Sequence, residues 1–269
     1  MAVVTHAPDT SPSAHKGASR RRWAHIVGDL LLVVGGLVLA YPYWSSAYAH
    51  VQQGRLDDSY ALQAESYRAA TFTLPATRPR GVSPEERVRR LAGLFADTLE
   101  RGDPVGRLRI PAIDVDSLVQ HGVRGPQSLD PDGDRVLLRN GPVHYGDTPL
   151  PGAGEPFAVA GHRTTYGAPF NRLAELRAGD VVFMDTPYAR FRYTVTKTTV
   201  VEPTDTGVLL DRGYGLVLTT CTPMYSASHR LIVWAQLESF TIYNERRRSP
   251  AGATGHPAPG SSSSPAAAP

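Results

Sequence analysis

The stretch FRYTVTKTTVV, residues 191–201, gives the clearest indication of the fold class of this chain. Phe191, Tyr193 and Val195 alternate with polar side chains. Because successive side chains of a strand point to opposite faces, this period of two is typical of a strand with one buried face. The stretch therefore predicts a long β-strand that packs against an apolar core.

The same period extends from Gly106 onward, where Gly and Pro separate short apolar runs. Further strands are predicted at residues 107–111, 112–120, 157–161, 181–185, 216–221 and 230–243, with a short helix near 170–177. Many short strands favour a barrel that leaves no open sheet edge, and about 140 residues suffice for one core. The sequence thus predicts a mainly β fold, a closed or nearly closed β-barrel of about eight strands.

A helix is predicted in front of the barrel, at residues 84–101. Ser83 is a capping residue, Pro84 occupies the first helical position and Glu86 lies three residues after the cap. Apolar residues then follow at helical spacing, and Gly102 is expected to end the helix. The stripe that should bury against the barrel is Val88, Leu91, Leu94, Phe95 and Leu99.

Residues 26–44 form an apolar run whose one charged residue is Asp29. At about 1.5 Å per residue the run is long enough to cross a hydrocarbon core of roughly 30 Å. A basic cluster precedes it, formed by Lys16, Arg20, Arg21 and Arg22. The positive-inside tendency then places residues 1–25 in the cytoplasm and the chain after Trp44 outside the cell.

The alternative is a cleaved secretory signal, because Ala47-Tyr48-Ala49 has the small-x-small form of a signal peptidase site. Either interpretation exports the rest of the chain. Residues 45–82 are polar and are expected to form a stalk or linker, followed by a domain over 83–245. Residues 246–269, rich in Pro, Ser and Ala, are expected to be a disordered tail.

The charge distribution gives no support to a nucleic-acid partner. The net charge of +3 arises in the flanks, which hold the basic cluster near the N-terminus and a second one at residues 246–248. The domain between them is close to neutral, whereas nucleic-acid binding requires a basic surface.

Cys221 is the single cysteine of the chain, in LVLTTCTP at residues 216–223. One thiol cannot form an internal disulfide, so in an exported domain Cys221 is expected to be a nucleophile, an intermolecular disulfide partner or a small buried hydrophobe. A nucleophilic thiol has an ordinary pKa of about 8.5 and needs a base or a cation nearby. Four histidines lie in the predicted barrel: His121, His144, His162 and His229.

His162 is the favoured base, because it follows the small-residue strand end Ala158–Gly161 and would be held rigidly there. Arg230 begins a strand nine residues after Cys221 and could stabilise an oxyanion. Structural roles remain open for both: a histidine hydrogen-bonded at the barrel rim and an ordinary surface arginine.

Taken together, GHRTTYGAPFNRL at residues 161–173, LTTCTP at 218–223 and HRLIVWA at 229–235 resemble the sortases, membrane-anchored cysteine transpeptidases of Gram-positive bacteria. The resemblance extends over residues 106–243 and is strongest to the class E housekeeping group of high-GC actinobacteria. One residue departs from the family pattern Thr-Leu-x-Thr-Cys. Val217 stands where the first threonine belongs.

The resemblance implies a catalytic role for His162, Cys221 and Arg230. Cys221 would attack the Thr-Gly bond of a C-terminal sorting signal on a secreted protein and form a thioester. His162 would protonate the leaving amine, Arg230 would hold the oxyanion, and an amine of a peptidoglycan precursor would resolve the thioester. No nucleic acid takes part.

Class E sortases tend to favour Leu-Ala-x-Thr-Gly over Leu-Pro-x-Thr-Gly signals, and the resemblance places Tyr145 on the wall facing the second motif position. A large ring there would leave room for alanine and crowd proline; the alternative is that Tyr145 packs in the barrel rim. Thr219, Thr220 and His144 are the further residues expected to contact substrate.

No metal or cofactor is predicted. The chain has no CxxC pair and no His/Cys cluster with zinc spacing. The acidic stretch at residues 130–134 is similar to a calcium loop, but its Gly precedes the third Asp and Gly141 stands where a bidentate Glu is required. An acidic turn is the favoured interpretation. Two rival functions remain: a cysteine hydrolase that does not transfer, and a noncatalytic surface-anchored binding domain.

Overall fold

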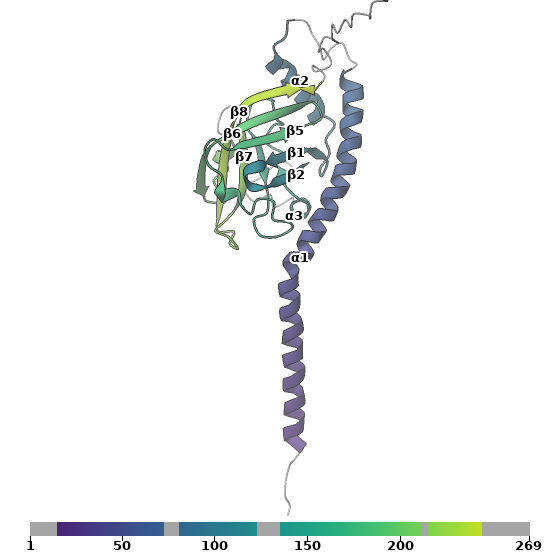
Figure 1. Ribbon diagram of the computed structural model, residues 1–269, viewed down its shortest axis with the longest axis vertical. Coiled ribbons are helices and arrows are strands. Elements are labelled where there is room, and N and C mark those ends of the chain that lie inside the picture. Colours follow the sequence, from purple (N-terminus) through teal and green to yellow (C-terminus); the bar gives the residue numbers. More distant parts are fainter. Residues whose placement is uncertain (1–14, 73–80, 123–134, 211–214, 244–269) are drawn as a thin grey trace, which may run out of the picture.

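The computed structural model describes residues 15–72, 81–122, 135–210 and 215–243 of the 269-residue chain. A long helix, α1 (His15–Phe72), is followed by a short helix, α2 (Pro84–Ala96), and by a β-barrel. The barrel lies beside the C-terminal half of α1, while the N-terminal half extends away from it (Figure 1). The acidic stretch at 130–134 and the tail at 246–269 lie outside the described residues.

Eight strands close the barrel in the order β1-β2-β3-β4-β7-β8-β6-β5. They are β1 (Pro104–Ile110), β2 (Val115–His121), β3 (Val143–His144), β4 (Phe157–Ala160), β5 (Val181–Asp185), β6 (Ala189–Val201), β7 (Gly215–Thr222) and β8 (His229–Ile242). Neighbouring pairs are antiparallel except β2 with β3 and β4 with β7. The prediction of a closed β-barrel of about eight strands is confirmed.

The structure differs from the predicted strands at two points. β3 was not expected, because its two residues are too few for a period to be recognised. The strand predicted from residue 112 begins only at Val115, because a single 3-10 turn, η2 (Pro111–Ile113), and the left-handed Asp114 (φ 56°) come first. Short helical turns also occur at α3 (Arg135–Leu138), η4 (Leu173–Glu175) and η5 (Thr206–Leu210).

The barrel wall is buried on both faces at β4, β7 and β8. Leu216 and Leu218 of β7 belong to the cluster that fills the barrel, whereas Val217 belongs to a second cluster on the outer face. Alternation of side chains along a strand explains the division. The outer cluster comprises Leu137, Leu138, Val143, Tyr145, Ala158, Ala160, Leu209, Val217 and Ile232.

α2 begins as the sequence predicts. The Ser83 side chain accepts a hydrogen bond from the Glu86 backbone N–H (3.2 Å), and Pro84 opens the helix. The helix ends at Ala96, five residues earlier than predicted, because the Thr98 hydroxyl bonds back to the Phe95 carbonyl (2.7 Å) and favours a turn. Of the apolar stripe predicted for this helix, Val88, Leu91 and Phe95 are buried. Leu94 is 40% exposed and Leu99 is partly buried.

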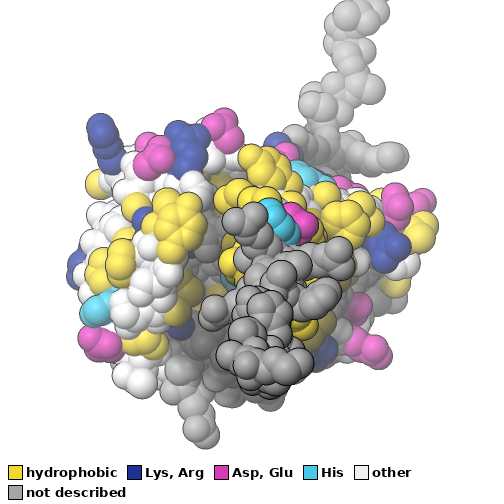
Figure 2. Space-filling model, turned by 90° about the horizontal axis from the view of Figure 1, so that it is seen from below, with side chains coloured by type: hydrophobic (Ala, Val, Ile, Leu, Met, Phe, Trp, Pro, Cys, Tyr) yellow, Lys and Arg dark blue, Asp and Glu magenta, His cyan; other side chains and the backbone are white. Residues whose placement is uncertain are grey.

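The N-terminal half of α1 exposes its apolar side chains along the whole run from Trp23 to Tyr48. Among the described residues, the segment His25–Thr71 is the helix long and apolar enough to cross a membrane. Figure 2 views the molecule from below and shows hydrophobic side chains gathered near the centre of this face, with most Lys, Arg, Asp and Glu side chains toward its edges. An exposed apolar surface of this length is expected to be covered by lipid.

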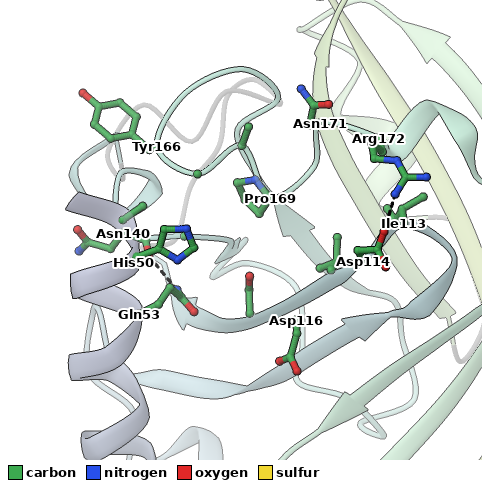
Figure 3. A pocket seen from close by; sticks show the side chains of 16 residues that line it. His50, Gln53, Ile113, Asp114, Asp116, Asn140, Tyr166, Pro169, Asn171 and Arg172 are labelled. Carbon is green, nitrogen blue, oxygen red and sulfur yellow. Dashed lines mark hydrogen bonds and ion pairs between the residues drawn. The ribbon is translucent and has the colours of Figure 1, made fainter. Parts of the chain in front are cut away.

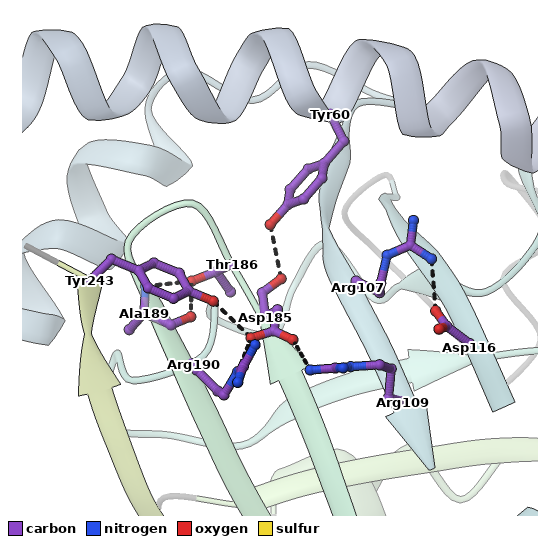
Figure 4. Close-up of polar contacts among 9 residues, drawn as sticks. All are labelled: Tyr60, Arg107, Arg109, Asp116, Asp185, Thr186, Ala189, Arg190 and Tyr243. Atoms are coloured by element: carbon purple, nitrogen blue, oxygen red, sulfur yellow. Dashed lines mark hydrogen bonds and ion pairs between the residues drawn. The ribbon is translucent and has the colours of Figure 1, made fainter. Parts of the chain in front are cut away.

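The C-terminal half of α1, which includes most of the residues expected to form a stalk, lies against the barrel. The Gln53 side chain bonds both backbone groups of Leu118 (2.8 and 3.2 Å) and the Asn140 carbonyl (2.8 Å). Farther along, the Tyr60 hydroxyl donates to the Asp185 carbonyl (3.0 Å), as Figure 4 shows. Side-chain contacts with barrel backbone thus hold this half of the helix in place.

Asp185, at the end of β5, joins the strands beneath Tyr60. Its carboxylate accepts hydrogen bonds from Arg109, Arg190 and Tyr243 (Figure 4). Burial opposes ionisation, but the bonds from Arg190 and Tyr243 outweigh it and hold the pKa of Asp185 below its ordinary value. The carboxylate therefore stays ionised and ties β1, β5, β6 and the end of β8 together.

Gln53→Ala should destabilise the chain, because the fully buried Leu118 N–H then loses its acceptor. An unsatisfied buried donor costs about 1 to 3 kcal/mol. Urea unfolding of the full chain in detergent micelles measures the loss, with Gln52→Ala as the control for the same change one position earlier. Equal unfolding midpoints for the two variants would contradict this role of Gln53.

Candidate active site

Cys221 and Arg230 lie directly opposite each other on β7 and β8. Side chains at such paired positions project from the same face of an antiparallel sheet. The Cys221 thiol is partly exposed, while Arg230 is 4% exposed and its guanidinium donates to the Ala227 and His229 carbonyls (2.8 and 3.1 Å). A cation is therefore anchored in the barrel wall beside the sulfur.

His162 lies on the other side of Cys221, just beyond the end of β4. The parallel register pairs Ala160 with Thr219, and a hydrogen bond from the Gly161 N–H to the Thr219 carbonyl (3.1 Å) continues the ladder. His162 and Cys221 lie two residues beyond Ala160 and Thr219, so the same register, if extended, sets them level with each other. At this end of the ladder, the Arg163 guanidinium donates hydrogen bonds to the Cys221 carbonyl (3.1 Å) and the Thr222 hydroxyl (2.7 Å).

The register thus sets Cys221 opposite Arg230 and, extended two residues past the end of β4, level with His162; we call these three residues the row. Cys221 has the same parity along β7 as Val217, which lies in the outer cluster. The row is therefore on the outer face of the barrel. A thiol with an imidazole on one side and a guanidinium on the other can carry out acyl transfer through a thioester.

Tyr145 and Thr219 lie on the same outer face. Both are buried, and the Tyr145 hydroxyl and the Thr219 hydroxyl share a hydrogen bond of 2.8 Å. The Tyr145 ring packs in the outer cluster with Val217, one step along β7 from Thr219. A wall of Tyr145, Val217 and Thr219 thus leads along β7 toward the thiol.

Thr220 points the other way. It is 3% exposed, and its hydroxyl donates to the Gly161 carbonyl (2.8 Å). This bond fixes the last peptide before His162. The structure places Thr220 behind the row, where it supports the backbone of β4.

His144 is not brought to the row. Its neighbours Val143 and Tyr145 face outward, so His144 faces inward, where its ring packs on Phe157 (centroids 4.8 Å apart). Its ring nitrogens contact the Thr148 carbonyl (2.8 Å) and His121 (3.1 Å). His144 was expected to contact substrate, but its inward-facing ring is 1% exposed and lies away from the row.

Tyr166 is a further residue beside His162 that the sequence did not single out. Its ring lies against the His162 ring, with centroids 5.3 Å apart and planes 30° apart. The sequence signal was the motif HRTTYG itself, but a loop has no period from which to infer that two of its side chains meet.

A pocket of about 250 Å³ lies between α1, η2, the start of β2 and the loop that follows His162. Figure 3 shows His50, Gln53, Asn140 and Tyr166 beside the helix and Asp114 with Arg172 across from them. The three residues of the row are absent from its lining. Within the part of the chain that the structure describes, no group of three His, Cys, Asp or Glu side chains could hold a metal ion.

The chain is similar to known sortases. The family model described as a sortase domain matches residues 108–238. Sortase SrtE2 of Streptomyces coelicolor is 28% identical over 265 residues, covering 88% of this chain and 93% of the relative. Sortase SrtE1 of the same organism is 26% identical over 230 residues, covering 78% of this chain, which spans 56% of the length of SrtE1. The solved structure of sortase E from Streptomyces avermitilis is 33% identical, covering 55% of this chain and 95% of that chain, with a TM-score of 0.47.

His144 gives the domain a specific pH dependence. Burial, followed by the charge of His121, lowers the pKa of His144 to about 3, whereas an unfolded histidine titrates near about 6.5. Below about pH 6.5 His144 binds a proton in the unfolded chain but stays neutral in the folded domain. The stability of the fold that depends on neutral His144 is therefore fully present above about pH 6.5 and is lost as the pH falls toward 3.

His144→Gln and His144→Phe cannot bind that proton, so both should unfold with a weaker dependence on pH. Urea unfolding of the full chain in detergent between pH 7.5 and 5 measures the difference in slope, which is at most about 1.4 kcal/mol per pH unit. Wild-type and variant curves that run parallel would show that His144 does not titrate in this way.

Proposed function

Because the chain belongs to the sortase family, whose transpeptidases are cysteine enzymes, we propose that it is a membrane-anchored cysteine transpeptidase of the cell surface. It cleaves a Leu-Ala-x-Thr-Gly or Leu-Pro-x-Thr-Gly sorting signal between Thr and Gly. It then joins the secreted protein to an amine of a peptidoglycan precursor. The proposal is supported by the strand register, which sets Arg230 opposite Cys221 and extends past the end of β4 to bring His162 level with the thiol.

In the first half of the reaction, the Cys221 sulfur attacks the carbonyl carbon of the motif threonine. The carbonyl electrons move onto oxygen, and their return breaks the carbon–nitrogen bond. His162 donates a proton to the departing glycine amine, which leaves a thioester on Cys221. The central position of Cys221 in the row supports this division of roles.

In the second half, an amine attacks the thioester and His162 takes up its proton. The Cys221 thiolate leaves, which restores the starting enzyme. Arg230 stabilises the oxyanion in both halves. Its two hydrogen bonds to loop carbonyls hold the guanidinium before substrate arrives, and a cation that needs no reorganisation stabilises developing charge most effectively.

The proposed orientation follows from α1 and the basic residues before it. Residues 1–25 lie in the cytoplasm, residues 26–44 cross the membrane once, and residues 45–82 connect the span to the catalytic domain at 83–245, outside the cell. The exposed apolar half of α1 supports the span. Secreted proteins and cell-wall precursors are encountered on that side of the membrane.

The thioester can be tested directly with the full chain in detergent micelles. Incubation with a Leu-Ala-x-Thr-Gly peptide should give a mass increase on Cys221, and addition of an amine should convert it into a ligated product. Cys221→Ala should give neither, and Cys221→Ser controls for side-chain size.

The alternative functions give different results in the same experiment. A thioester that yields only the free acid in the presence of amine would indicate a hydrolase. A folded chain that forms no adduct would indicate a noncatalytic binding domain. Full activity of Cys221→Ala would rule out the nucleophile proposed above.

Tyr145 is proposed to set the preference at the second motif position, which the bulk of its ring in the outer cluster supports. Tyr145→Ala should raise the rate on a Leu-Pro-x-Thr-Gly peptide relative to Leu-Ala-x-Thr-Gly, by roughly tenfold, within the range that steric pocket changes give. Tyr145→Phe removes only the bond to Thr219 and should keep the wild-type preference. Competition between the two peptides measures the ratio; an unchanged ratio in Tyr145→Ala would contradict the proposal.

A further inference from the structure

The loop that begins with His162 touches α1 at the end of the apolar run. Tyr41, Ser45, Tyr48 and Ala49 recur at helical spacing and therefore share one face of α1. We call these four residues the exit face. Ser45 and Ala49 are 2% and 5% exposed, whereas their neighbours Trp44 and Tyr48 are 78% and 41% exposed. This burial shows that the exit face is packed against the domain.

The exit face contacts one residue of the loop above all, Tyr166. The Tyr41 hydroxyl donates to the Tyr166 hydroxyl (3.0 Å), and the Tyr166 N–H donates to the Ser45 hydroxyl (3.4 Å). The Tyr48 ring packs edge-on against the Tyr166 ring, with centroids 6.5 Å apart. Across the ring, the guanidinium of Arg139 lies 5.7 Å from its centroid.

The backbone of Tyr166 needs such support. Its φ of 52° is in the left-handed region, which is unfavourable for a bulky side chain, and Gly167 follows with φ 75°. A Cβ on Gly167 would lie 3.5 Å from the Ala49 Cβ, so the loop and the helix are in close contact there. Strained residues of this kind persist where surrounding contacts hold them. The exit face supplies those contacts, and Figure 3 shows Tyr166 beside α1.

Tyr166 in turn covers the ring of His162. The backbone of His162 is held by the Phe170 N–H, which donates to its carbonyl (3.1 Å), and the Tyr166 ring adds a contact with the imidazole itself. A neighbouring aromatic ring restricts rotation of the imidazole about its side-chain bonds. General acid–base catalysis requires the imidazole nitrogen to be in hydrogen-bonding reach of the substrate amine.

We propose that the exit face of α1 is a working part of the active site. It holds Tyr166, and Tyr166 acts as a positioning residue that orients His162 for proton transfer. The proposal rests on the proposed catalytic role of His162. It implies that the membrane helix does more than retain the enzyme, since the turn in which it leaves the apolar run sets the geometry of the catalytic base.

The first test separates turnover from substrate binding, with the full chain in detergent micelles and a Leu-Ala-x-Thr-Gly peptide plus an amine. Tyr166→Ala should lower kcat about tenfold or more with little change in KM for the peptide, because misplacement of a catalytic group of this order has such an effect. Tyr166→Phe keeps the ring over His162 and loses only the hydroxyl bond, so its kcat should fall a few-fold, well short of the loss in Tyr166→Ala. Equal kcat values for Tyr166→Ala and wild type would overturn the proposal.

The second test asks whether α1 acts through Tyr166. Tyr41→Phe and Tyr166→Phe each remove the same hydrogen bond, so each should lower kcat a few-fold and the double variant should be no worse than either one. Tyr60→Phe is the matched control, because it removes one hydroxyl contact between the same helix and the barrel, far along α1 from the loop. It should keep wild-type kcat.

Cys221→Ala distinguishes the two proposals. If this variant stays active, the proposed function itself fails. If it is inactive while Tyr41→Phe, Tyr166→Phe and Tyr60→Phe all keep wild-type kcat, only the role of the exit face fails. Thermal unfolding of each variant shows whether a lowered kcat comes from lost folding. If Tyr166→Ala unfolds at a lower temperature than wild type, the comparison of Tyr41→Phe, Tyr166→Phe and the double variant decides. Strictly additive effects of these two substitutions on kcat would overturn the proposal.

Discussion

The register of β7 between β4 and β8 is the constraint on which the candidate site depends. Alternation along the strand sends Leu216 and Leu218 into the barrel and Cys221 to the outer face. A slip of one residue would reverse every side chain, remove both leucines from the barrel interior and turn the thiol inward. Burying a leucine contributes about 1.5 to 3 kcal/mol to stability. The packing of Leu216 and Leu218 therefore fixes the position of Cys221, which is itself not part of the core. The same register also sets the partners of Cys221, because it fixes Arg230 across one strand boundary and aligns His162 across the other.

The two faces of the wall therefore have different functions. On the inner side, Thr220 bonds the Gly161 carbonyl and holds the end of β4. Gly161 itself cannot carry a side chain, because a Cβ would lie 2.6 Å from the Phe170 ring. The loop after Gly161 can thus fold back closely over the barrel. On the outer side, the apolar cluster around Tyr145 and Val217 forms the wall along which a peptide would reach the thiol. The inner contacts give rigidity, and the outer ones are free to set specificity.

The sequence was sufficient for features that have a period or a motif. The alternation in residues 191–201 predicted a strand that forms β6, and Ser83 predicted the start of α2. The sequence also singled out Cys221 and Arg230, which lie opposite each other on β7 and β8, and His162, which follows the end of β4; their catalytic roles stay a prediction. It failed where tertiary contacts decide: β3 is too short to have a period, and the inward direction of His144 depends on where that strand begins. The sequence indicated a stalk over residues 45–82 but not its packing on the barrel, since Gln53 and Tyr60 act through bonds to the barrel backbone that no local pattern encodes.

The site also has to be placed relative to the membrane, and a continuous helix does this more firmly than a flexible stalk. Helix α1 continues from the exposed apolar run to Phe72, and Gln53, Tyr60 and Arg68 bond the barrel at intervals of about two turns. A rigid connection of this kind fixes both the height and the rotation of the barrel above the bilayer. Because Tyr41 lies at the end of the apolar run and also contacts the loop of His162 through Tyr166, that loop is held at the level where the helix would leave the lipid. Under the proposed function, His162 would then act close to the membrane surface, on the side where cell-wall precursors are encountered.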